Sequence, residues 1–447
     1  MSHPIPASAL ALGLLVACQP EVITPTYTTG EIGTVVTARW HAESLLDAAF
    51  TYETASGPLL APVHREATSD GFDYTATLLG LRSDTAYTAA LIMEDEDGVI
   101  VEQAEAFESG PLSLALPAID ATEPRSTPSG GFILTSLAID PSVTVILDEE
   151  GGYVWAHEEE TADVMVAQTI ADPRGGGIYY GVFDPARGKD GPLRAQQIVR
   201  VALDGSSTEV IDAPLFHHDF AVHDDGTVGY ITYDYRTADG VEIAGDQIVE
   251  RYPDGTYATV WTAWDSLSYS PTFAEQGPGW THANALNYDP GEDAYYISLH
   301  NYDAILKIDR ASGTVRWILG GLLSDFELID LTLNRQHQFD ILDDGLLIFN
   351  NGVIDDENAE VVEVRLDEEA MTATAVWRYD ADVTSAILGD AQRLDSGSTV
   401  VTFSTAGVID EVTTDGERLW RLESGFGTLF GFSTHLSDIQ TLAPLSP

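Results

Sequence analysis

The feature that most constrains the fold is a pattern that recurs three times between residues 217 and 345. Each copy has a histidine, then an apolar run, then an acidic turn that ends in glycine. The histidines are His218, His282 and His337, in the segments HHDFAVHDDG, HANALNYDPG and HQFDILDDG. Equivalent positions in tandem repeats take equivalent places in space. We therefore expect the three imidazoles to face one point.

A second regularity sets the size of the repeating unit. From about Gly131 to the end, strands ending near a tryptophan recur about every 45 to 60 residues, with LDGSSTEVI filling one slot that has no tryptophan. Six units of about four strands predict a six-bladed β-propeller, and the alternative is a β-solenoid with shorter coils. In a propeller the first strand of each blade lines the channel. Here those strands are expected to begin near Ala167, His218, His282, His337 and Gly389.

The N-terminal third predicts a different all-β unit. Short alternating strands separated by Gly, Asp and Ser turns over residues 28–110 favour a β-sandwich. Residues 19–27 are expected to be a tether, and the proline-rich residues 111–130 a linker before the propeller at 131–447. The segment LLGLRSDTAY, which ends at Tyr87, resembles the signature of fibronectin type III domains. That resemblance implies that Tyr87 closes a corner of the sandwich and that Trp40 is a core residue.

The first residues resemble a bacterial lipoprotein signal. The apolar run ALALGLLVA is too short to span a bilayer, and it leads into Leu-Val-Ala-Cys18, where Cys18 is the single cysteine. This lipobox-like segment, within a signal region of residues 1–18, implies that the signal peptide is cleaved before Cys18. It also implies acylation of Cys18, and an exported protein anchored in the cell envelope, at the outer membrane or facing the periplasm. An ordinary secretion signal with an incidental cysteine is the alternative.

The charge excludes some partners. The chain has 72 Asp and Glu against 20 Lys and Arg, a formal net charge of −52. Nucleic acids and anionic membrane surfaces are recognised by clustered cations, so neither is an expected partner, and membrane contact is expected only through Cys18. A solvated acidic coat explains the charge, and calcium binding by acidic loops is the alternative. The oligomeric state does not follow from these features.

Three inward imidazoles permit two kinds of chemistry. Three neutral imidazoles can bind zinc or copper and leave a position open. Alternatively, one imidazole acts as nucleophile or base while the others hold a developing anion. A structural interpretation stands beside both, in which the rings only satisfy buried backbone groups. The alignment of three copies in register favours a functional site. His223, just before the first turn, is expected to be exposed.

Four short motifs then decide between the chemistries. HHD at 217–219, T-H-x-N-A-L at 281–286, W-x-L-G-G at 317–321 and Q-H at 336–337 occur in this order. Over residues 130–447 the chain resembles the bacterial arylsulfotransferases that work without a nucleotide donor. The resemblance implies an exported six-bladed propeller that moves a sulfuryl group from a phenolic sulfate ester to a phenol. It implies no cofactor and no metal.

The same resemblance assigns roles. The Q-H motif places the transiently sulfated nucleophile at His337, with His218, His282 and Asn284 as catalytic partners. His217, His300 and Arg335 are expected to bind substrate. An uncharged imidazole suits this role, because it attacks an anionic sulfate ester without charge repulsion.

One departure matters. The family usually has an arginine about where His300 stands, and a histidine cannot form a bidentate fork with sulfate. Arg335 is the expected substitute, if it shares a strand face with His337. A non-catalytic or metal-binding propeller that acts as a binding module is therefore the alternative function.

Overall fold

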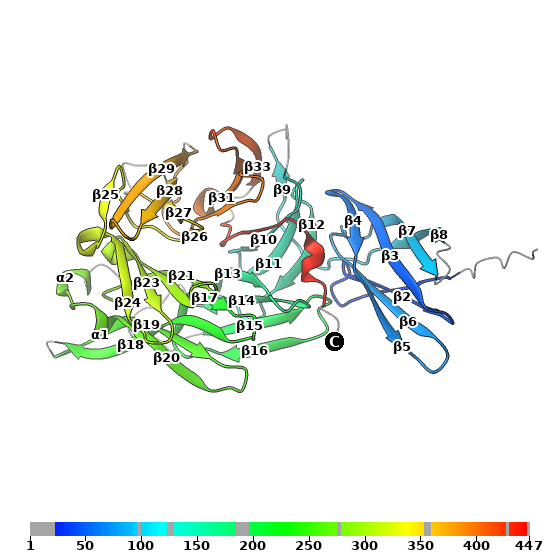
Figure 1. The fold of residues 1–447 in the computed structure, drawn as a ribbon, viewed down its shortest axis with the longest axis horizontal. Coiled ribbons are helices and arrows are strands. Elements are labelled where there is room, and N and C mark those ends of the chain that lie inside the picture. Colours follow the sequence, from blue (N-terminus) through cyan, green and yellow to red (C-terminus); the bar gives the residue numbers. More distant parts are fainter. Residues whose placement is uncertain are drawn as a thin grey trace, which may run out of the picture.

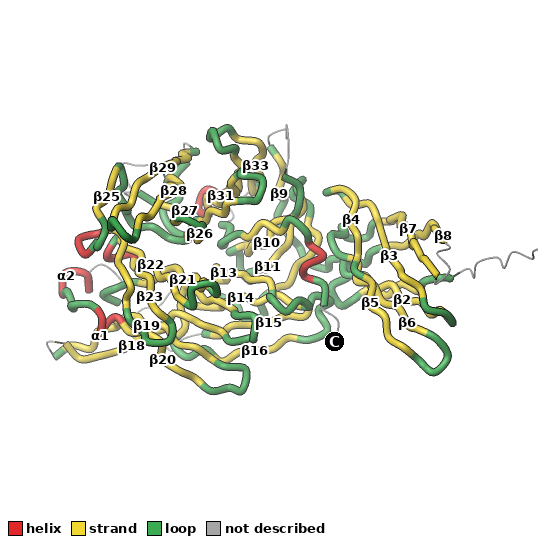
Figure 2. The backbone as a smooth tube through the Cα atoms, in the orientation of Figure 1, coloured by secondary structure: helices red, strands yellow, loops and turns green. Residues whose placement is uncertain are grey.

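The computed structural model describes residues 23–95, 100–122, 129–184, 196–238, 240–274, 279–352, 359–381, 383–425 and 429–444. Strands dominate these residues and helices are few and short (Figures 1 and 2). A small sandwich of two sheets lies beside a ring of six further sheets (Figure 1). This confirms the all-β prediction of a sandwich followed by a six-bladed propeller. The predicted signal segment and Cys18 lie outside the described residues.

The sandwich consists of two four-stranded sheets. One has the order β1-β2-β6-β5 and the other β4-β3-β7-β8, with every pair antiparallel. The strands are β1 (Thr26–Thr29), β2 (Val36–Ala42), β3 (Leu46–Thr54), β4 (Gly57–Ala61), β5 (Val63–Ala67), β6 (Phe72–Leu78), β7 (Ala86–Asp95) and β8 (Ile100–Glu108). β1 begins inside the segment predicted as a tether, so the sandwich starts earlier than residue 28.

The residues of the fibronectin-like signature lie where that resemblance implies. The Tyr87 hydroxyl accepts a hydrogen bond of 2.7 Å from the backbone N–H of Arg82, five residues upstream, which is the geometry of a tyrosine corner. Trp40 is buried and stacks on Tyr74 with ring centroids 5.5 Å apart. Alternation in β2, where every second residue is buried, supplies one wall of this core.

The propeller ring has six blades, which we number along the chain. Blade 1 contains β10 (Phe132–Leu137), β11 (Val143–Asp148), β12 (Tyr153–Glu158) and β34 (Thr434–Leu436); blade 2, β13 (Met165–Ala171), β14 (Gly177–Phe183), β15 (Gln197–Ala202) and β16 (Thr208–Asp212). Blade 3 contains β17 (Phe216–Val222), β18 (Val228–Ala238), β19 (Val241–Arg251) and β20 (Tyr257–Thr262); blade 4, β21 (Ala283–Asp289), β22 (Ala294–Leu299), β23 (Ala304–Asp309) and β24 (Val315–Gly320).

The last two blades have five strands each. Blade 5 contains β25 (Glu327–Ile329), β26 (Phe339–Leu342), β27 (Gly345–Asn350), β28 (Glu360–Asp367) and β29 (Thr372–Asp380), with β25 parallel to β29. Blade 6 contains β9 (Ile119–Ala121), β30 (Asp390–Arg393), β31 (Thr399–Phe403), β32 (Val408–Val412) and β33 (Arg418–Ser424). Short helical turns are α1 (Ala263–Ser266), α2 (Pro271–Ala274), η1 (His300–Tyr302), η2 (Gly321–Leu323), η3 (Ser404–Ala406) and η4 (Ile439–Leu442).

Both ends of the propeller segment close the ring. β9, from the segment predicted as a linker, pairs with β33 as the outer strand of blade 6. β34, near the C-terminus, pairs with β10 and completes blade 1. One hydrophobic cluster joins these blades, with Ile133 and Val145 against Val400 and Trp420. The predicted linker is therefore partly a propeller strand.

The repeating tryptophans join neighbouring blades. They lie on the outer strands, and four of them donate an indole hydrogen bond of 2.7–2.9 Å to the next blade around the ring. The pairs are Trp155 with Leu203, Trp317 with Glu368, Trp377 with Thr414, and Trp420 with Glu149. A large apolar ring with one donor suits this position, because it fills the gap between sheets and ties them together.

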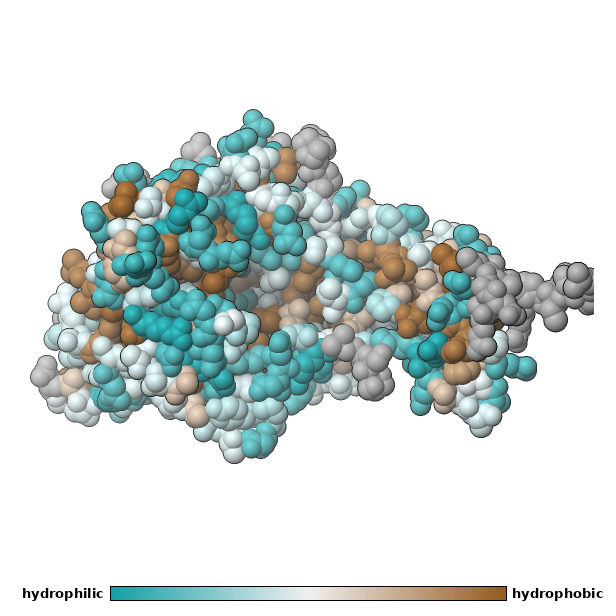
Figure 3. Space-filling model, in the orientation of Figure 1, coloured by the Kyte–Doolittle hydropathy of each residue, from teal (hydrophilic) through white to brown (hydrophobic). Residues whose placement is uncertain are grey.

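Many acidic residues serve the turns rather than a ligand. Asp225 accepts a hydrogen bond from the Thr227 N–H at 2.8 Å, and Asp254 accepts one from the Thr256 N–H at 2.9 Å. Such side-chain contacts to the backbone two residues on are the usual reason for Asp in turns. In Figure 3, hydrophilic residues cover much of the visible propeller surface. This arrangement supports the interpretation of the acidic residues as turn formers and a solvated coat.

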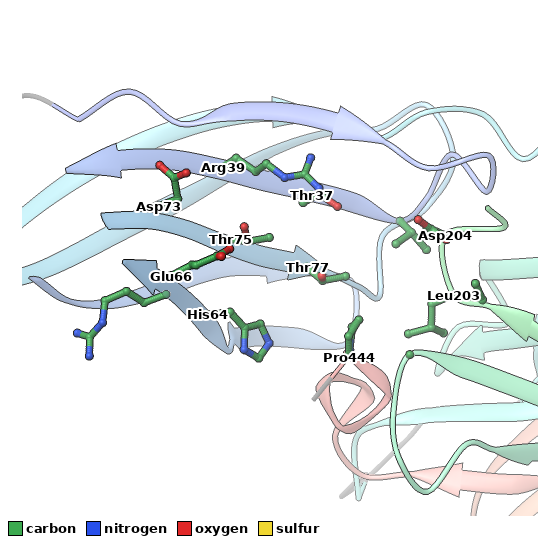
Figure 4. Close-up of a pocket in the computed structure, with 14 residues that line it drawn as sticks. Thr37, Arg39, His64, Glu66, Asp73, Thr75, Thr77, Leu203, Asp204 and Pro444 are labelled. Carbon is green, nitrogen blue, oxygen red and sulfur yellow. The ribbon is translucent and has the colours of Figure 1, made fainter. Parts of the chain in front are cut away.

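The sandwich packs directly on the propeller. Arg82 donates to Asp148 at 2.6 Å and to Glu150 at 2.7 Å, and Gln440 donates to the Tyr52 hydroxyl at 2.5 Å. A cleft of about 710 Å³ lies alongside this junction, between the outer face of the β1-β2-β6-β5 sheet and the propeller (Figure 4). None of the predicted site residues lines it. Among the described residues, no helix has the length and apolar character needed to cross a membrane.

Candidate active site

The predicted histidines form a continuous row across three blades. His217 and His218 lie on β17, His282 immediately precedes β21, His300 begins η1, and His337 lies shortly before β26. Ring centroids are 5.0 Å apart for His217–His218, 5.3 Å for His218–His282, 4.6 Å for His282–His300 and 6.0 Å for His300–His337. The in-register histidines therefore lie in one row rather than around one point, with His217 at one end and His300 between His282 and His337.

Irregular backbone at the inner strands places these rings. His218 has φ 59° and His282 has φ 52°, in the left-handed region that non-glycine residues seldom adopt. The pairing register of β17 with β18 shifts between Phe216 and Phe220, so the strand bulges at His218. Such conformations cost about 1–3 kcal/mol each and concentrate at functional sites. The blades therefore give up local stability to turn these histidines toward one another.

Burial lowers the pKa values of the four half-buried or buried rings His218, His282, His300 and His337, which favours their uncharged forms near neutral pH. Burial lowers the pKa of His337 to about 4 and that of His282 to about 3. The pKa of His218 lies well below its usual value because of burial and the neighbouring imidazoles, and that of His300 is lowered mainly by burial. His337 is 5% exposed, whereas His218, His282 and His300 are half-buried. The site is therefore a set of neutral imidazoles that are partly open to solvent.

Asn351, which was not among the predicted site residues, fixes the tautomer of His337. The Nδ1 atom of His337 lies 2.8 Å from the Asn351 Oδ1 atom. The Asn351 amide nitrogen donates to the carbonyls of Ser385 at 2.6 Å and Leu388 at 2.8 Å, so the oxygen must face His337. Nδ1 therefore carries the proton, and Nε2 carries the lone pair. The signal in the sequence is the pair Asn350-Asn351, which ends the apolar strand β27 at the same edge as His337.

Arg335 supplies a cation near the end of the row, although the shared strand face on which its role was conditional is absent. It does not share a strand face with His337, because β26 begins only at Phe339 and Arg335 is in a left-handed bend with φ 55°. Its N–H donates to Asp303 Oδ1 at 2.8 Å, and its Nε donates to His300 Nε2 at 3.2 Å. Among the described carboxylates, none forms an ion pair with the Arg335 guanidinium, so its charge faces the row uncompensated.

Two predicted residues lie behind the row. His217 is 4% exposed, and its ring stacks on Tyr233 with centroids 3.8 Å apart, so it contacts His218 rather than open space. Asn284 is fully buried, and its Nδ2 donates to the Gln336 carbonyl at 2.8 Å, which holds the chain just before His337. Both residues therefore support the half-buried histidines of the row, and their predicted roles toward the substrate stay predictions.

The inner strands of the blades also contribute a layer of buried polar side chains. Asp219 accepts from the Leu286 N–H at 2.7 Å and from Gln338 at 3.0 Å, and it is fully buried. Burial raises the pKa of Asp219 to about 7, and burial likewise raises that of Asp390 to about 7. Asp390 accepts from the Ser433 N–H at 3.0 Å, across the seam between blades 6 and 1. This layer ties the inner strands together.

His223 belongs to a separate cluster, and the expectation that it is exposed was wrong. It is 7% exposed and its Nε2 lies 2.7 Å from the Tyr295 hydroxyl. That hydroxyl donates to Glu250 at 2.9 Å, and Glu250 also accepts from Arg310 at 2.5 Å and 3.0 Å. The cluster joins blade 3 to blade 4 and lies outside the row.

A metal centre finds no support in the described part of the chain. Among those residues, no three His, Cys, Asp or Glu side chains are grouped so that they could hold a metal ion. The rings of the row touch in sequence rather than converge on one point at ligand distance. The arrangement suits attack and charge stabilisation better than metal coordination.

The comparison with protein families decides the class. The family model described as arylsulfotransferase (ASST) matches residues 122–423. The chain belongs to the arylsulfotransferase family. The match covers the blades that carry the histidine row, and the family consists of sulfotransferase-type enzymes whose substrates are small aryl sulfates and phenols. A comparison with curated proteins gave no match.

Solved structures with related architecture are distant. A protein of unknown function from Bacteroides caccae is 12% identical, with a TM-score of 0.45, over 68% of this chain and 98% of its own. A streptogramin B lyase structure is 14% identical, with a TM-score of 0.38, over 68% and 86%. A periplasmic gluconolactonase from Pseudomonas aeruginosa is 9% identical, with a TM-score of 0.37, over 71% and 98%. Similarity at this level carries no inference about activity.

Proposed function

We propose that this arylsulfotransferase moves a sulfuryl group from a phenolic sulfate ester to an acceptor phenol through sulfated His337. One observation carries the proposal. The hydrogen bond from His337 Nδ1 to a fixed Asn351 leaves the Nε2 lone pair as the nucleophile. A neutral ring held in one tautomer and orientation is what a covalent mechanism requires.

The chemistry balances in two half-reactions. In the first, Nε2 of His337 bonds to sulfur while the bond from sulfur to the aryl oxygen breaks, and the departing oxygen takes a proton. In the second, the acceptor phenol loses its proton as its oxygen attacks sulfur, and the N–S bond breaks. The donor phenol leaves before the acceptor reacts, so the kinetics are ping-pong.

The surrounding groups suit a singly charged sulfate ester. Arg335 provides a permanent positive charge, and the half-buried His218, His282 and His300 provide ring nitrogens along the row. One cation and several imidazole rings can stabilise a bound anion enough to offset the hydration free energy that the anion loses when it leaves water. On this proposal Arg335 takes the place of the arginine that the family usually has where His300 stands.

The deciding experiment compares His337 with a histidine outside the row. The purified protein is incubated with 4-nitrophenyl sulfate, with and without phenol, and release of the coloured product is followed. We expect acceptor-dependent release and a sulfuryl adduct on His337 by mass spectrometry, both lost in His337→Ala. His157→Asn, which changes a half-buried histidine of blade 1, is the matched control and should stay active. Equal activity in His337→Ala and the control would refute the mechanism.

A binding module without catalysis is the second candidate, and His300 is the residue that favours it. If the family's arginine has been lost together with activity, the folded wild-type protein should bind aryl sulfates without releasing phenol. Acceptor-dependent turnover would exclude this candidate.

We further propose, from the lipobox-like sequence, that Cys18 is acylated and anchors an exported protein to the cell envelope. Labelling with a fatty acid, compared between the wild type and Cys18→Ser, tests this. A protein that remains in the membrane fraction and stays unlabelled in both forms would rule the anchor out.

A further inference from the structure

A buried carboxylate lies at the far end of the histidine row from His337. Asp246, on β19, is fully buried. Its Oδ2 atom accepts hydrogen bonds of 2.6 Å from the Thr281 hydroxyl and 2.6 Å from the Ala283 N–H. Its Oδ1 atom lies 3.2 Å from Nε2 of His217, a close charge contact outside hydrogen-bond geometry, so that neither atom has a hydrogen-bond partner among the described residues. A fully buried carboxylate next to a functional row calls for an explanation, since burying an uncompensated charge costs several kcal/mol.

His217 connects this carboxylate to the row. Its Nδ1 lies 2.7 Å from Nδ1 of His218, and its ring stacks on Tyr233. Both ring nitrogens of His217 therefore face groups of the protein. The order Asp246, His217, His218 places a carboxylate, a buried imidazole and a half-buried imidazole in line.

The charge of the carboxylate then orders the protons. A negative charge 3.2 Å from Nε2 stabilises a proton on that nitrogen, so this contact favours the His217 tautomer with Nε2–H and a lone pair on Nδ1. The contact of 2.7 Å between the two Nδ1 atoms needs one proton, which His218 Nδ1 must supply. In the uncharged state His218 is thus left with a lone pair on Nε2, on the side of the ring away from His217.

The mechanism needs a proton carrier in this place. The departing aryl oxygen must receive one proton for each sulfuryl group transferred to His337, and the acceptor phenol must later give one up. His337 cannot supply it, because its Nδ1–H is bonded to Asn351. We propose that Asp246 and His217 are positioning residues that enable His218 to donate this proton to the leaving phenol and to accept one from the acceptor.

This inference rests on the proposed function and adds two residues to it. His218 takes up a proton from solvent as the anionic ester binds, and Asp246 balances the resulting imidazolium through His217. When the S–O bond breaks, Nε2 of His218 gives that proton to the aryl oxygen, and the row is neutral again. In the second half-reaction the acceptor's proton returns to the same nitrogen. The arrangement follows the logic of the carboxylate–histidine pairs that orient imidazoles in other enzymes.

The charged and titratable groups around His218 are consistent with this role. From blade 3 they are Asp246, His217 and Tyr233, and from blade 4, His282 and His300. His337 faces it from blade 5, and Arg335 lies beyond His300. Asp246 is the anion in this set, at the end opposite the Arg335 cation. The row therefore runs from a negative to a positive terminus, with the reacting nitrogen at the positive end.

The leaving group provides a test that a structural role would not pass. 4-Nitrophenolate leaves readily without a proton, whereas phenolate, being more basic, does not. Asp246→Asn should therefore lower kcat with phenyl sulfate by about 10²-fold, in the range for a lost general acid, and with 4-nitrophenyl sulfate much less. The phenyl-to-nitrophenyl ratio, measured on one preparation, is independent of how much protein is folded. His217→Gln should shift the ratio in the same direction.

Asp148→Asn is the matched control. Asp148 is an equally buried carboxylate that accepts backbone N–H groups, but it lies at the junction with the sandwich. It should leave the ratio unchanged even if it lowers stability. Equal losses with both donors in Asp246→Asn and His217→Gln, or no loss, would overturn the relay while leaving His337 sulfation intact. An inactive wild type would instead overturn the proposed function itself.

Discussion

Removing the Arg335 charge is the sharpest perturbation of substrate binding. Arg335→Gln keeps a side chain of similar length but removes the cation. At an effective dielectric constant of about 20, unit charges about 4 Å apart attract by roughly 4 kcal/mol. Arg335 is partly exposed, so solvent reduces this to roughly 2–3 kcal/mol. We therefore expect kcat/KM to fall by about 30- to 150-fold.

The assay is the initial rate of 4-nitrophenol release at saturating phenol, over a range of donor concentrations. Arg335→Lys should recover part of the loss, because it restores the charge without the planar fork. The exchange variant His300→Arg with Arg335→His should recover more, since it keeps one guanidinium at the same end of the row. His300→Arg alone would bring two guanidiniums close together, because Nε of Arg335 lies 3.2 Å from Nε2 of the histidine that this substitution replaces.

Arg335→Gln within threefold of the wild type would refute this reasoning. Such a result would mean that the imidazoles hold the sulfuryl oxygens without a permanent cation. Circular dichroism should first show that the variant keeps the strand content of the wild type.

Three further predictions concern the supports of the site. Asn351→Ala should lower kcat by about 10-fold or more by freeing the His337 tautomer, whereas Asn350→Ala, the neighbouring control, should affect mainly stability; equal rates in both would contradict this. Glu250→Gln should lower the free energy of unfolding by about 3 kcal/mol in urea, monitored by tryptophan fluorescence, because it leaves Arg310 without its buried partner. Burial raises the pKa of Asp219 from its ordinary value of 3.8 to about 7 in the folded protein. Between these two pH values the folded state therefore binds a proton that the unfolded state has lost, and the free energy of unfolding should fall by up to roughly 4 kcal/mol as pH rises from about 4 to 7. Asp219→Asn should flatten that slope, and an unchanged slope would assign it to general charge repulsion.

The sequence predicted the blades because the signals are local and repeated. Apolar runs separated by Asp-Gly turns define strands within a few residues of one another, and the tryptophans repeat at the edge of each blade. The row of His218, His282 and His337 followed from register alone. Equivalent positions in the repeats do lie side by side, as the ring contacts show.

The parts that escaped prediction depend on contacts between distant segments and on backbone irregularity. Asn351 reaches His337 from a different loop, and Asp246 meets His217 from two strands away. Strand periodicity could place Arg335 on the face of His337 only if a strand ran through both residues, and a left-handed residue instead carries its guanidinium to His300. Periodicity describes regular strands, and these side chains are placed by bulges and bends that it does not encode.

The strand β34, which completes blade 1 and closes the propeller ring, determines how the protein responds to C-terminal truncation. β34 is three residues long and lies within about fifteen residues of the C-terminus, yet it covers the edge of β10, whose six residues are all buried. A chain that ended just before Thr434 would expose the backbone N–H and C=O groups of Phe132, Ile133 and Leu134 as an open sheet edge. Open apolar edges recruit strands from other molecules. Premature termination there is therefore expected to produce association between chains rather than a slightly trimmed monomer.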